Sequence, residues 1–528
     1  MTVTVSFPGI YIEELPLSAH AIAPAPTSIA AFVGYTHPLR TTAGFNTAVE
    51  LFSFTDYENQ FGGLYTSGIV DSNVARSVFQ FFQNGGSHAW VVGLQPKLLD
   101  AGGGVLGTLG GATGLNFTAT VPTQPAGNGL VFTAKEPTDI VPMNVSITNL
   151  RPSSPLPGAA LDMFDVIITY GARIETFRGV VINGDPSLAP DAKINATTST
   201  LVKVAPPAGN GFGSSVAANS KVAFSITLPA GFATTFSPQD FVDVFEADTS
   251  LDKVEIFNLL LVPGVADNLV VSAALTFAER KRAFAILDPP PTATADGPGS
   301  IDKLMTAFPK SQNGALYFPY LLSTDLITTT TLTEPPSGFV AGIYAATDAS
   351  RGVWKAPAGL ATTLRSTSGP VITGLMNDPR QGVLNLASVN CLRSFAGVGT
   401  VVWGARTLVA DNDAFAQSKY IPVRRMTLFL EQSLLASLRW VVFEPNDEPL
   451  WLAIRSSIES FMLSLFNQGA LQGAKPSDAF QVKCDATTTT PDDQQRGIVN
   501  IIVAFAPLKP AEFVVIKIAQ LAGQTAAA

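Results

Sequence analysis

The chain has 528 residues, which is too long for one ordinary hydrophobic core and predicts about three domains. Hydrophobic residues make up 46% of the sequence and charged residues only 14%, a composition typical of globular rather than disordered proteins. The formal net charge of −9 argues against sequence-independent nucleic-acid binding, because such binding needs cationic side chains to displace counterions from phosphates. So few charges also favour a surface that partners cover, although long Gly- and Pro-rich loops would lower the charge as well.

The first residues have the pattern of an extended arm rather than of a packed domain. Apolar and polar residues alternate with the period of a strand, and no second strand follows to close a hairpin. The partner strand must therefore lie elsewhere, in this chain or in another subunit. The segment has no basic region or apolar core of a secretion signal, so we expect synthesis in the cytoplasm. The apolar residues of this arm are Val3, Val5, Phe7, Ile10, Tyr11 and Ile12.

Residues 1–25 are predicted to be this arm and its linker, and residues 26–97 to be the first part of an α/β domain. The stretch 71–83 spaces its apolar residues as a helix does, Asn84-Gly85-Gly86 ends the helix, and HAWVVGL continues as a strand. Residues 250–365 alternate between helix and strand in the same way and are predicted to complete the domain. Within them, Pro335-Pro336 with Gly338 and Gly342 predict a tight turn and a close backbone approach.

Residues 98–249 have a different texture and are predicted to form an inserted β-rich domain. Short alternating segments such as LNFTATV, FDVIITY and VAFSITL are separated by Gly, Pro, Asn and Asp, as in a sandwich or barrel. Glycines 102, 104 and 107 match G-x-G-x-x-G, but no strand runs straight into them and no helix follows. We interpret them as a flexible loop.

Residues 366–510 are predicted to form a C-terminal α+β domain. Its clearest elements are amphipathic helices over about 424–438 and 451–466, followed by strand-like segments at FQVKCDA and GIVNIIVAFA. Residues 511–528 are predicted to be a second extended arm. Its apolar residues are Phe513, Val514, Val515, Ile516 and Ile518, of which Val514, Ile516 and Ile518 share one face.

Motifs that would carry chemistry are sparse. The three histidines, His20, His37 and His88, are scattered, and Cys391 and Cys484 are interpreted as small buried hydrophobic residues. The apolar runs are shorter than the roughly 20 residues that span a bilayer, so we expect no membrane insertion. We predict no catalytic residue, cofactor or metal. A hydrolase with a β-rich binding domain is a third possible class of function.

Seven segments in the same order resemble the contractile-tail sheath proteins of bacteriophages, R-type pyocins and phage-derived extracellular injection systems. The resemblance covers both arms and roughly residues 250–518, and no motif in 98–245 contributes to it. The segments are FPGIYIEEL (7–15), PPSGFVAGIYAATDASRGVWKAPAG (335–359), VNCLRSFAGVGTVVWGARTL (389–408), YIPVRRM (420–426), VFEPNDEPLW (442–451), NQGALQGAKPSDAFQVKCD (467–485) and APLKPAEFVVIKI (506–518).

The resemblance implies a structural subunit that polymerises helically around an inner tube in a metastable extended state and contracts to drive the tube through a target envelope. It implies that arm strands from neighbouring subunits complete the C-terminal domain, which lies innermost, with the β-rich domain outermost. The residues that could then face the tube are Arg424, Arg425, Arg455 and Glu459.

The expected partners are further copies of the chain, the tube protein, and baseplate and terminal cap proteins, without nucleic acid. The particle would be a virion tail or a phage-tail-like particle, which could be released from the cell. The alternative function is a non-contractile structural component of a phage-like tail or baseplate.

Overall fold

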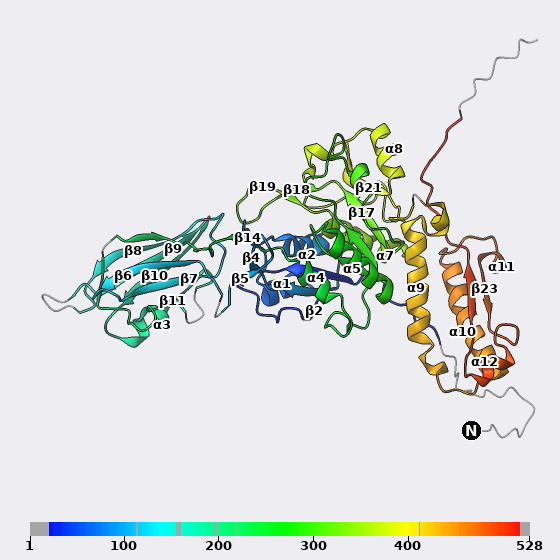
Figure 1. Cartoon of the computed structure of the whole chain (residues 1–528), viewed down its shortest axis with the longest axis horizontal. Coiled ribbons are helices and arrows are strands. Elements are labelled where there is room, and N and C mark those ends of the chain that lie inside the picture. Colours follow the sequence, from blue (N-terminus) through cyan, green and yellow to red (C-terminus); the bar gives the residue numbers. More distant parts are fainter. Residues whose placement is uncertain are drawn as a thin grey trace, which may run out of the picture. The chain divides into compact units, whose positions relative to one another are not determined.

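The computed structural model describes most of the chain, and its described residues separate into two compact units (Figure 1). The larger unit contains 26–350 and 357–419. The smaller contains 21–25, 351–356 and 420–517. The described ranges are 21–111, 114–154, 160–195, 199–217, 219–410 and 412–517.

The larger unit is built on one mixed sheet, which among the described residues has the order β2-β3-β1-β15-β16-β17-β21-β22. The strands from β3 to β21 run parallel, and β2 and β22 are antiparallel edges. Continuous apolar runs such as AAFVGY in β1 suit a sheet buried on both faces. The strands are β1 (Ala30–Tyr35), β2 (Ala48–Leu51), β3 (Ala89–Leu94), β15 (Leu259–Leu261), β16 (Phe284–Leu287), β17 (Gly314–Phe318), β21 (Val389–Phe395) and β22 (Gly399–Trp403).

Helices cover this sheet (Figure 1). Helix α2 packs on β1, α5 packs on β16, and a 2.7 Å hydrogen bond joins the hydroxyls of Tyr344 in α7 and Tyr317 in β17. The side chain of Asp267 begins α5 by accepting the Leu269 and Val270 N–H groups. The helices are α1 (Phe54–Phe61), α2 (Asn73–Gln83), α4 (Pro238–Val244), α5 (Asn268–Lys281), α6 (Ile301–Leu304), α7 (Ser337–Arg351) and α8 (Asp378–Leu386), with 3-10 turns η2 (Ile372–Gly374) and η3 (Asp413–Ser418).

Two small sheets flank the large one. One has the order β19-β18-β20 and the other β14-β4-β5, which joins the two ends of the β-rich segment. Their strands are β4 (Lys97–Asp100), β5 (Val105–Thr108), β14 (Phe232–Thr234), β18 (Leu321–Thr324), β19 (Thr331–Glu334) and β20 (Gly369–Pro370).

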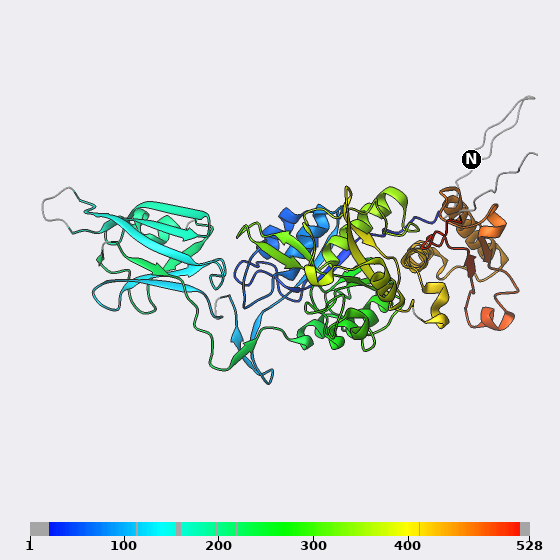
Figure 2. The same ribbon diagram turned by 90° about the horizontal axis from the view of Figure 1, so that it is seen from above.

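The β-rich segment forms a sandwich of two sheets with the orders β10-β9-β8-β13 and β11-β7-β6-β12 (Figure 2). Its two ends meet, because the backbone N–H of Thr118 donates to Ser225 O at 2.8 Å and that of Ser225 to Thr118 O at 3.0 Å. The elements are β6 (Thr118–Gln124), β7 (Gly129–Ala134), β8 (Met143–Arg151), β9 (Met163–Tyr170), β10 (Arg173–Val181), η1 (Pro186–Leu188), α3 (Pro190–Ile194), β11 (Val202–Ala205), β12 (Ser215–Val216) and β13 (Lys221–Ala223).

Residues 366–419, which the sequence predicts to begin the C-terminal domain, lie instead in the larger unit. Strand β21 pairs with β17 in parallel, Leu316 opposite Val389, and β22 pairs with β21. These residues therefore belong to the α/β unit, because pairing with a distant strand buries the apolar run VNCL. The smaller unit resumes at Tyr420.

The smaller unit packs two long helices and a short sheet around a separate core. Met426, Phe429 and Leu430 of α9 pack with Ile454, Ile458 and Met462 of α10. Among the described residues, no helix is long and apolar enough to cross a membrane. The elements are α9 (Ile421–Ser437), η4 (Arg439–Val441), α10 (Glu448–Asn467), α11 (Pro476–Ala479), β23 (Phe480–Lys483), α12 (Pro491–Gln495) and β24 (Ile502–Phe505).

Candidate functional site: an open sheet and a buried junction

The short sheet of the smaller unit has two open edges in the described part of the chain. Strands β23 and β24 pair with each other antiparallel, Gln481 opposite Ala504, and neither has another strand beside it. A sheet of two strands is marginal in water and usually needs further strands or a covering helix. Helix α10 contacts β23, but Ile502 in β24 remains 53% exposed. The sheet therefore offers backbone groups and apolar surface that added strands could cover.

The C-terminal arm leaves this unit as an exposed apolar segment. Residues up to Glu512 are tied down, since the Tyr420 hydroxyl lies 3.1 Å from Glu512 Oε2 and the Gln472 N–H donates to Ala506 O at 2.9 Å. Beyond it, residues 513–517 form neither helix nor strand. Phe513 is 72% exposed and Val514, Val515 and Ile516 are each 79% exposed. Four consecutive exposed apolar side chains are unusual and mark a surface that awaits a partner.

The chain enters the smaller unit from its N-terminal side along α9. The N–H groups of Ala23 and Ala25 donate to the hydroxyls of Ser437 and Ser433, at 3.1 and 3.0 Å, and Ile22 is buried in the core. We had interpreted this stretch as a plain linker. The predicted arm residues Val3, Val5, Phe7, Ile10, Tyr11 and Ile12, and Ile518 of the other arm, lie outside the described residues.

The four predicted tube-facing residues differ in what they can offer a partner. Glu459 is exposed and Arg455, one turn earlier on α10, is half-buried. Arg424 on α9 lies 3.8 Å from Glu431. Arg425 is only 4% exposed, so it cannot present its charge to a tube. Helical periodicity alone does not reveal that this side chain is buried.

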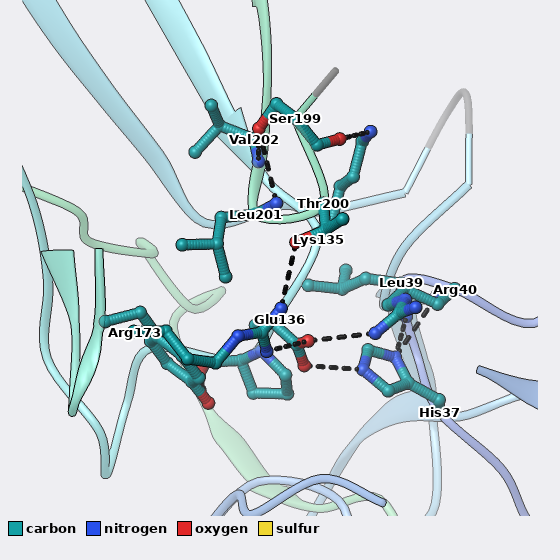
Figure 3. Close-up of polar contacts among 12 residues, drawn as sticks. His37, Leu39, Arg40, Lys135, Glu136, Arg173, Ser199, Thr200, Leu201 and Val202 are labelled. Atoms are coloured by element: carbon teal, nitrogen blue, oxygen red, sulfur yellow. Dashed lines mark hydrogen bonds and ion pairs between the residues drawn. The ribbon is translucent and has the colours of Figure 1, made fainter. Parts of the chain in front are cut away.

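A second polar site lies where the sandwich meets the α/β domain (Figure 3). Glu136, two residues after β7, is 2% exposed. Its carboxylate accepts hydrogen bonds from one histidine and two arginine side chains. His37 Nε2 lies 2.9 Å from its Oε2, and Arg40 Nη1 and Arg173 Nη1 each lie 3.0 Å from its Oε1. Arg173 comes from β10, whereas His37 and Arg40 come from the loop after β1. The carboxylate therefore links the sandwich to the α/β domain.

The hydrogen bonds of His37 fix which nitrogen carries the proton. Nδ1 accepts the backbone N–H groups of Leu39 at 3.2 Å and Arg40 at 3.1 Å, so it holds a lone pair. The proton must then be on Nε2, which donates it to Glu136. Burial lowers the pKa of His37 below its ordinary value of 6.5, although Glu136 opposes this effect. Burial alone would raise the pKa of Glu136, but the His37 hydrogen bond and nearby positive charges outweigh it and lower that pKa.

This junction is not predictable from local sequence patterns. His37 and Glu136 are 99 residues apart, and each lies in a stretch whose local pattern gives no sign of the other. The signal that the sequence offers is a carboxylate, Glu136, two residues after the end of an alternating strand.

The motifs that were weighed for chemistry have structural roles. Gly102 and Gly104 lie in the turn between β4 and β5, and Gly107 lies in β5, so no helix N-terminus faces them. Burial raises the pKa of the Cys391 thiol to about 12 and that of Cys484 to about 11, which keeps both protonated. No group of three or more His, Cys, Asp or Glu in the described ranges is arranged to hold a metal ion.

Two domain models of one protein family match the chain. The phage tail sheath protein central domain matches residues 242–408, and the phage tail sheath C-terminal domain matches residues 413–520. Together they cover slightly more than half of the chain. The first match ends after β22, in line with the place of β21 and β22 in the large sheet. A prophage major tail sheath protein of Pseudomonas aeruginosa (strain UCBPP-PA14) is 30% identical over 262 residues, or 48% of this chain. This chain spans 62% of that relative's length.

Two solved structures share the fold over almost the whole chain. One is the sheath complex of an extracellular contractile injection system, PVC, in its contracted state, with a TM-score of 0.58 and 22% identity over 98% of this chain and 99% of that one. The other is the helical sheath of the anti-feeding prophage in its contracted state, with a TM-score of 0.56 and 22% identity over 98% and 100%. Coverage this complete includes the β-rich segment, where the sequence offers no motif.

Proposed function

Because this chain belongs to the phage tail sheath family, we propose that it is the repeating subunit of a contractile sheath. In this proposal it polymerises helically around an inner tube in a metastable extended state and contracts to push the tube through a target envelope. The observation that carries the proposal lies in the smaller unit. This unit has both a two-stranded sheet with open edges and an exposed apolar segment.

Strand exchange between copies would satisfy both features at once. Phe513, Val514, Val515, Ile516 and Ile518 of one subunit would add to the β23–β24 sheet of a neighbour. The N-terminal residues Val3, Val5, Phe7, Ile10, Tyr11 and Ile12 would add to the sheet of another. Each ladder hydrogen bond contributes only about 0.5 to 1.5 kcal/mol net, so an arm of five or six residues adds several kcal/mol per subunit. A chain of such links would hold the polymer together while its rigid bodies rotate.

The partners follow from this arrangement. The first is the chain itself, and the others are a tube protein, a baseplate and a terminal cap. Of the residues on α9 and α10, exposed Glu459 and half-buried Arg455 are the better candidates for the tube, and half-buried Arg424 on α9 is a further one. Buried Arg425 is not proposed again. No catalytic step is proposed, because the energy for contraction would be stored in the extended assembly itself.

Electron microscopy of the assembled protein tests the proposal. We expect helical tubes in two lengths, long and narrow before a trigger such as mild denaturant and short and wide after it, without added nucleotide. Tubes of one fixed length under all triggers would instead favour the alternative, a non-contractile tail or baseplate component. Contraction that requires ATP would contradict the stored-energy mechanism.

A further inference from the structure

The junction loop, residues 37–40, is packed tightly on both sides. A β-carbon on Gly62, in the α/β domain, would stand 2.5 Å from Cβ of Arg40. One on Gly110, at the start of the β-rich segment, would stand 1.9 Å from the Pro38 carbonyl oxygen. Leu39 packs against the hydrophobic core of the sandwich. The junction loop therefore cannot shift while both neighbours keep their places.

His37 holds the shape of this loop through its own unprotonated nitrogen. The two N–H groups that point at Nδ1 belong to Leu39 and Arg40, so the imidazole ties the loop to itself as well as to Glu136. A second proton on His37 would have to sit on Nδ1, where it would face two N–H donors. Both hydrogen bonds would be lost, and the loop would have to open to admit the proton.

No charged or titratable group around His37 in the described part of the chain offers an acceptor for a proton on Nδ1. Glu136 faces Nε2 from the sandwich and already accepts from Arg40 and Arg173. The Tyr65 ring lies 5.1 Å from the imidazole. Lys135 donates to Ser199 O, on the sandwich itself (Figure 3). The side of His37 that faces Nδ1 is thus lined by N–H donors of its own loop.

We propose that the junction loop is an acid-sensitive latch, which fixes the sandwich to the α/β domain at neutral pH and releases it when Nδ1 of His37 gains a proton. The latch follows from the residues at the junction and does not depend on the proposed function. The buried imidazole has a lowered pKa, so the closed latch binds a proton less readily than the open one. The closed form is therefore favoured above about pH 6.5 and loses this advantage as the pH falls below it.

Hydrogen exchange of the full-length chain tests the latch directly. The amides of Leu39 and Arg40 are the donors to Nδ1, so their exchange, corrected for the intrinsic effect of pH, reports opening. Between about pH 7.5 and about pH 5.5 we expect the equilibrium constant for opening to rise about tenfold in the wild type. One histidine that has its ordinary pKa in the open form and a lowered pKa in the closed form gives a change of this size. His37→Asn keeps an acceptor near the position of Nδ1 but does not titrate, so its corrected exchange should not change with pH.

Two further variants keep the test decisive. His88→Asn is the matched control, because His88 pairs with Glu50 at the surface, at 2.8 Å, and its loss should leave the tenfold rise intact. Gly110→Ala crowds the Pro38 carbonyl without touching the histidine, so it should show open-latch exchange already at about pH 7.5. Unchanged wild-type exchange in acid would overturn the latch. The same pH response in His37→Asn as in the wild type would also overturn it. If His37→Asn does not fold, wild-type exchange of Gly110→Ala at about pH 7.5 would do so instead.

Discussion

Gly342 of α7 lies so close to Phe81 of α2 that a β-carbon on the glycine would stand 2.7 Å from the Phe81 carbonyl oxygen. One turn earlier, a β-carbon on Gly338 would stand 2.5 Å from Cα of Ser77. The two glycines thus bring the backbones of α2 and α7 into direct contact. The sequence predicts a close backbone approach at these glycines but in a tight turn, whereas the structure places them on α7.

We expect Gly342→Ala to lower the free energy of unfolding by about 1 to 3 kcal/mol, because the added methyl group overpacks the contact between α2 and α7. Gly382→Ala in α8 is the control, since nothing lies within 4 Å of the new methyl group there. It should stabilise by up to about 1 kcal/mol through helix propensity alone. Urea unfolding of both variants measures the difference. Equal stabilisation by the two alanines would mean that α2 and α7 are not in contact.

The buried carboxyl group of Asp288 should make the stability of the α/β domain depend on pH. Burial raises the pKa of Asp288 to about 6, although its carboxylate accepts from the N–H and hydroxyl of Ser337 and the N–H of Gly264. The unfolded chain keeps the ordinary value of 3.8, so the folded chain binds the proton first as the pH falls. The contribution of Asp288 to stability therefore grows between about pH 7 and about pH 5, by about 1 kcal/mol.

Urea unfolding of the wild type and Asp288→Asn at both pH values isolates this effect. Other titrating groups, including His37, are common to the two proteins and cancel in the difference. The free energy of unfolding of the wild type, relative to that of Asp288→Asn, should rise between about pH 7 and about pH 5. If the three donors kept the Asp288 carboxylate ionised, the free energy of unfolding of the wild type relative to Asp288→Asn would fall as the pH is lowered.

The C-terminal arm gives a prediction about assembly. Val515 and Ile516 are equally exposed in the single chain, at 79%, but in an added strand they would point to opposite faces. If Ile516 packs on a neighbour's core, Ile516→Asp buries a charge and should abolish tubes, while Val515→Asp should reduce them far less. Both monomers should unfold within about 0.5 kcal/mol of the wild type. Electron microscopy scores the tubes, and equal yields from the two variants would contradict a packed strand at this position.

The sandwich should be removable, but not without changes to the surface it covers. Thr118 and Ser225 are hydrogen-bonded to each other, so residues 119–224 can be replaced by a two-residue Asn-Gly turn. Leu39, Ile69 and Ile327 pack against the sandwich core and would become exposed. We therefore expect the excised chain to aggregate, and the same chain with serine at those three positions to stay dispersed and melt cooperatively.

Light scattering and calorimetry compare the two excised chains. Failure of both to fold would show that the α/β domain needs the sandwich, which is the opposite of what an inserted domain with its own core predicts. Dispersal of the chain that keeps Leu39, Ile69 and Ile327 would show that their contact with the sandwich is unimportant.

Local periodicity predicted the long helices well. The stretches 71–83, 424–438 and 451–466 correspond to α2, α9 and α10, whose ends differ by up to three residues. Each has an apolar stripe, which is a property of the stretch itself and needs no knowledge of the partner. The same stripe did not reveal that Arg425 is buried. Burial of a polar side chain depends on tertiary packing, which local periodicity does not contain.

Features that depend on distant partners were missed for a physical reason. Val389 joins the large sheet by pairing with Leu316, and His37 finds Glu136 across 99 residues. The apolar run VNCL is compatible with pairing to any buried parallel strand. Its sequence therefore does not indicate which domain residues 366–419 join. Residues 513–517, predicted to be part of an extended arm, form neither helix nor strand, and Phe513 to Ile516 are exposed. That they add to a neighbour's sheet stays a prediction.

The parallel pairing of β1 with β15 brings together Ile29 and Asn258, which are 229 residues apart, with the sandwich in between. Joining the ends of so long a loop costs conformational entropy, but the cost rises only logarithmically, by about 0.6 kcal/mol for each doubling of length. A sandwich that folds first brings Thr118 beside Ser225 and takes about half of those residues out of the loop, which lowers the closure cost by a similar 0.6 kcal/mol. The folding order is therefore biased toward the insertion before the sheet that carries it. Enlarging the insertion would slow or weaken that closure only slightly, provided its two ends still meet.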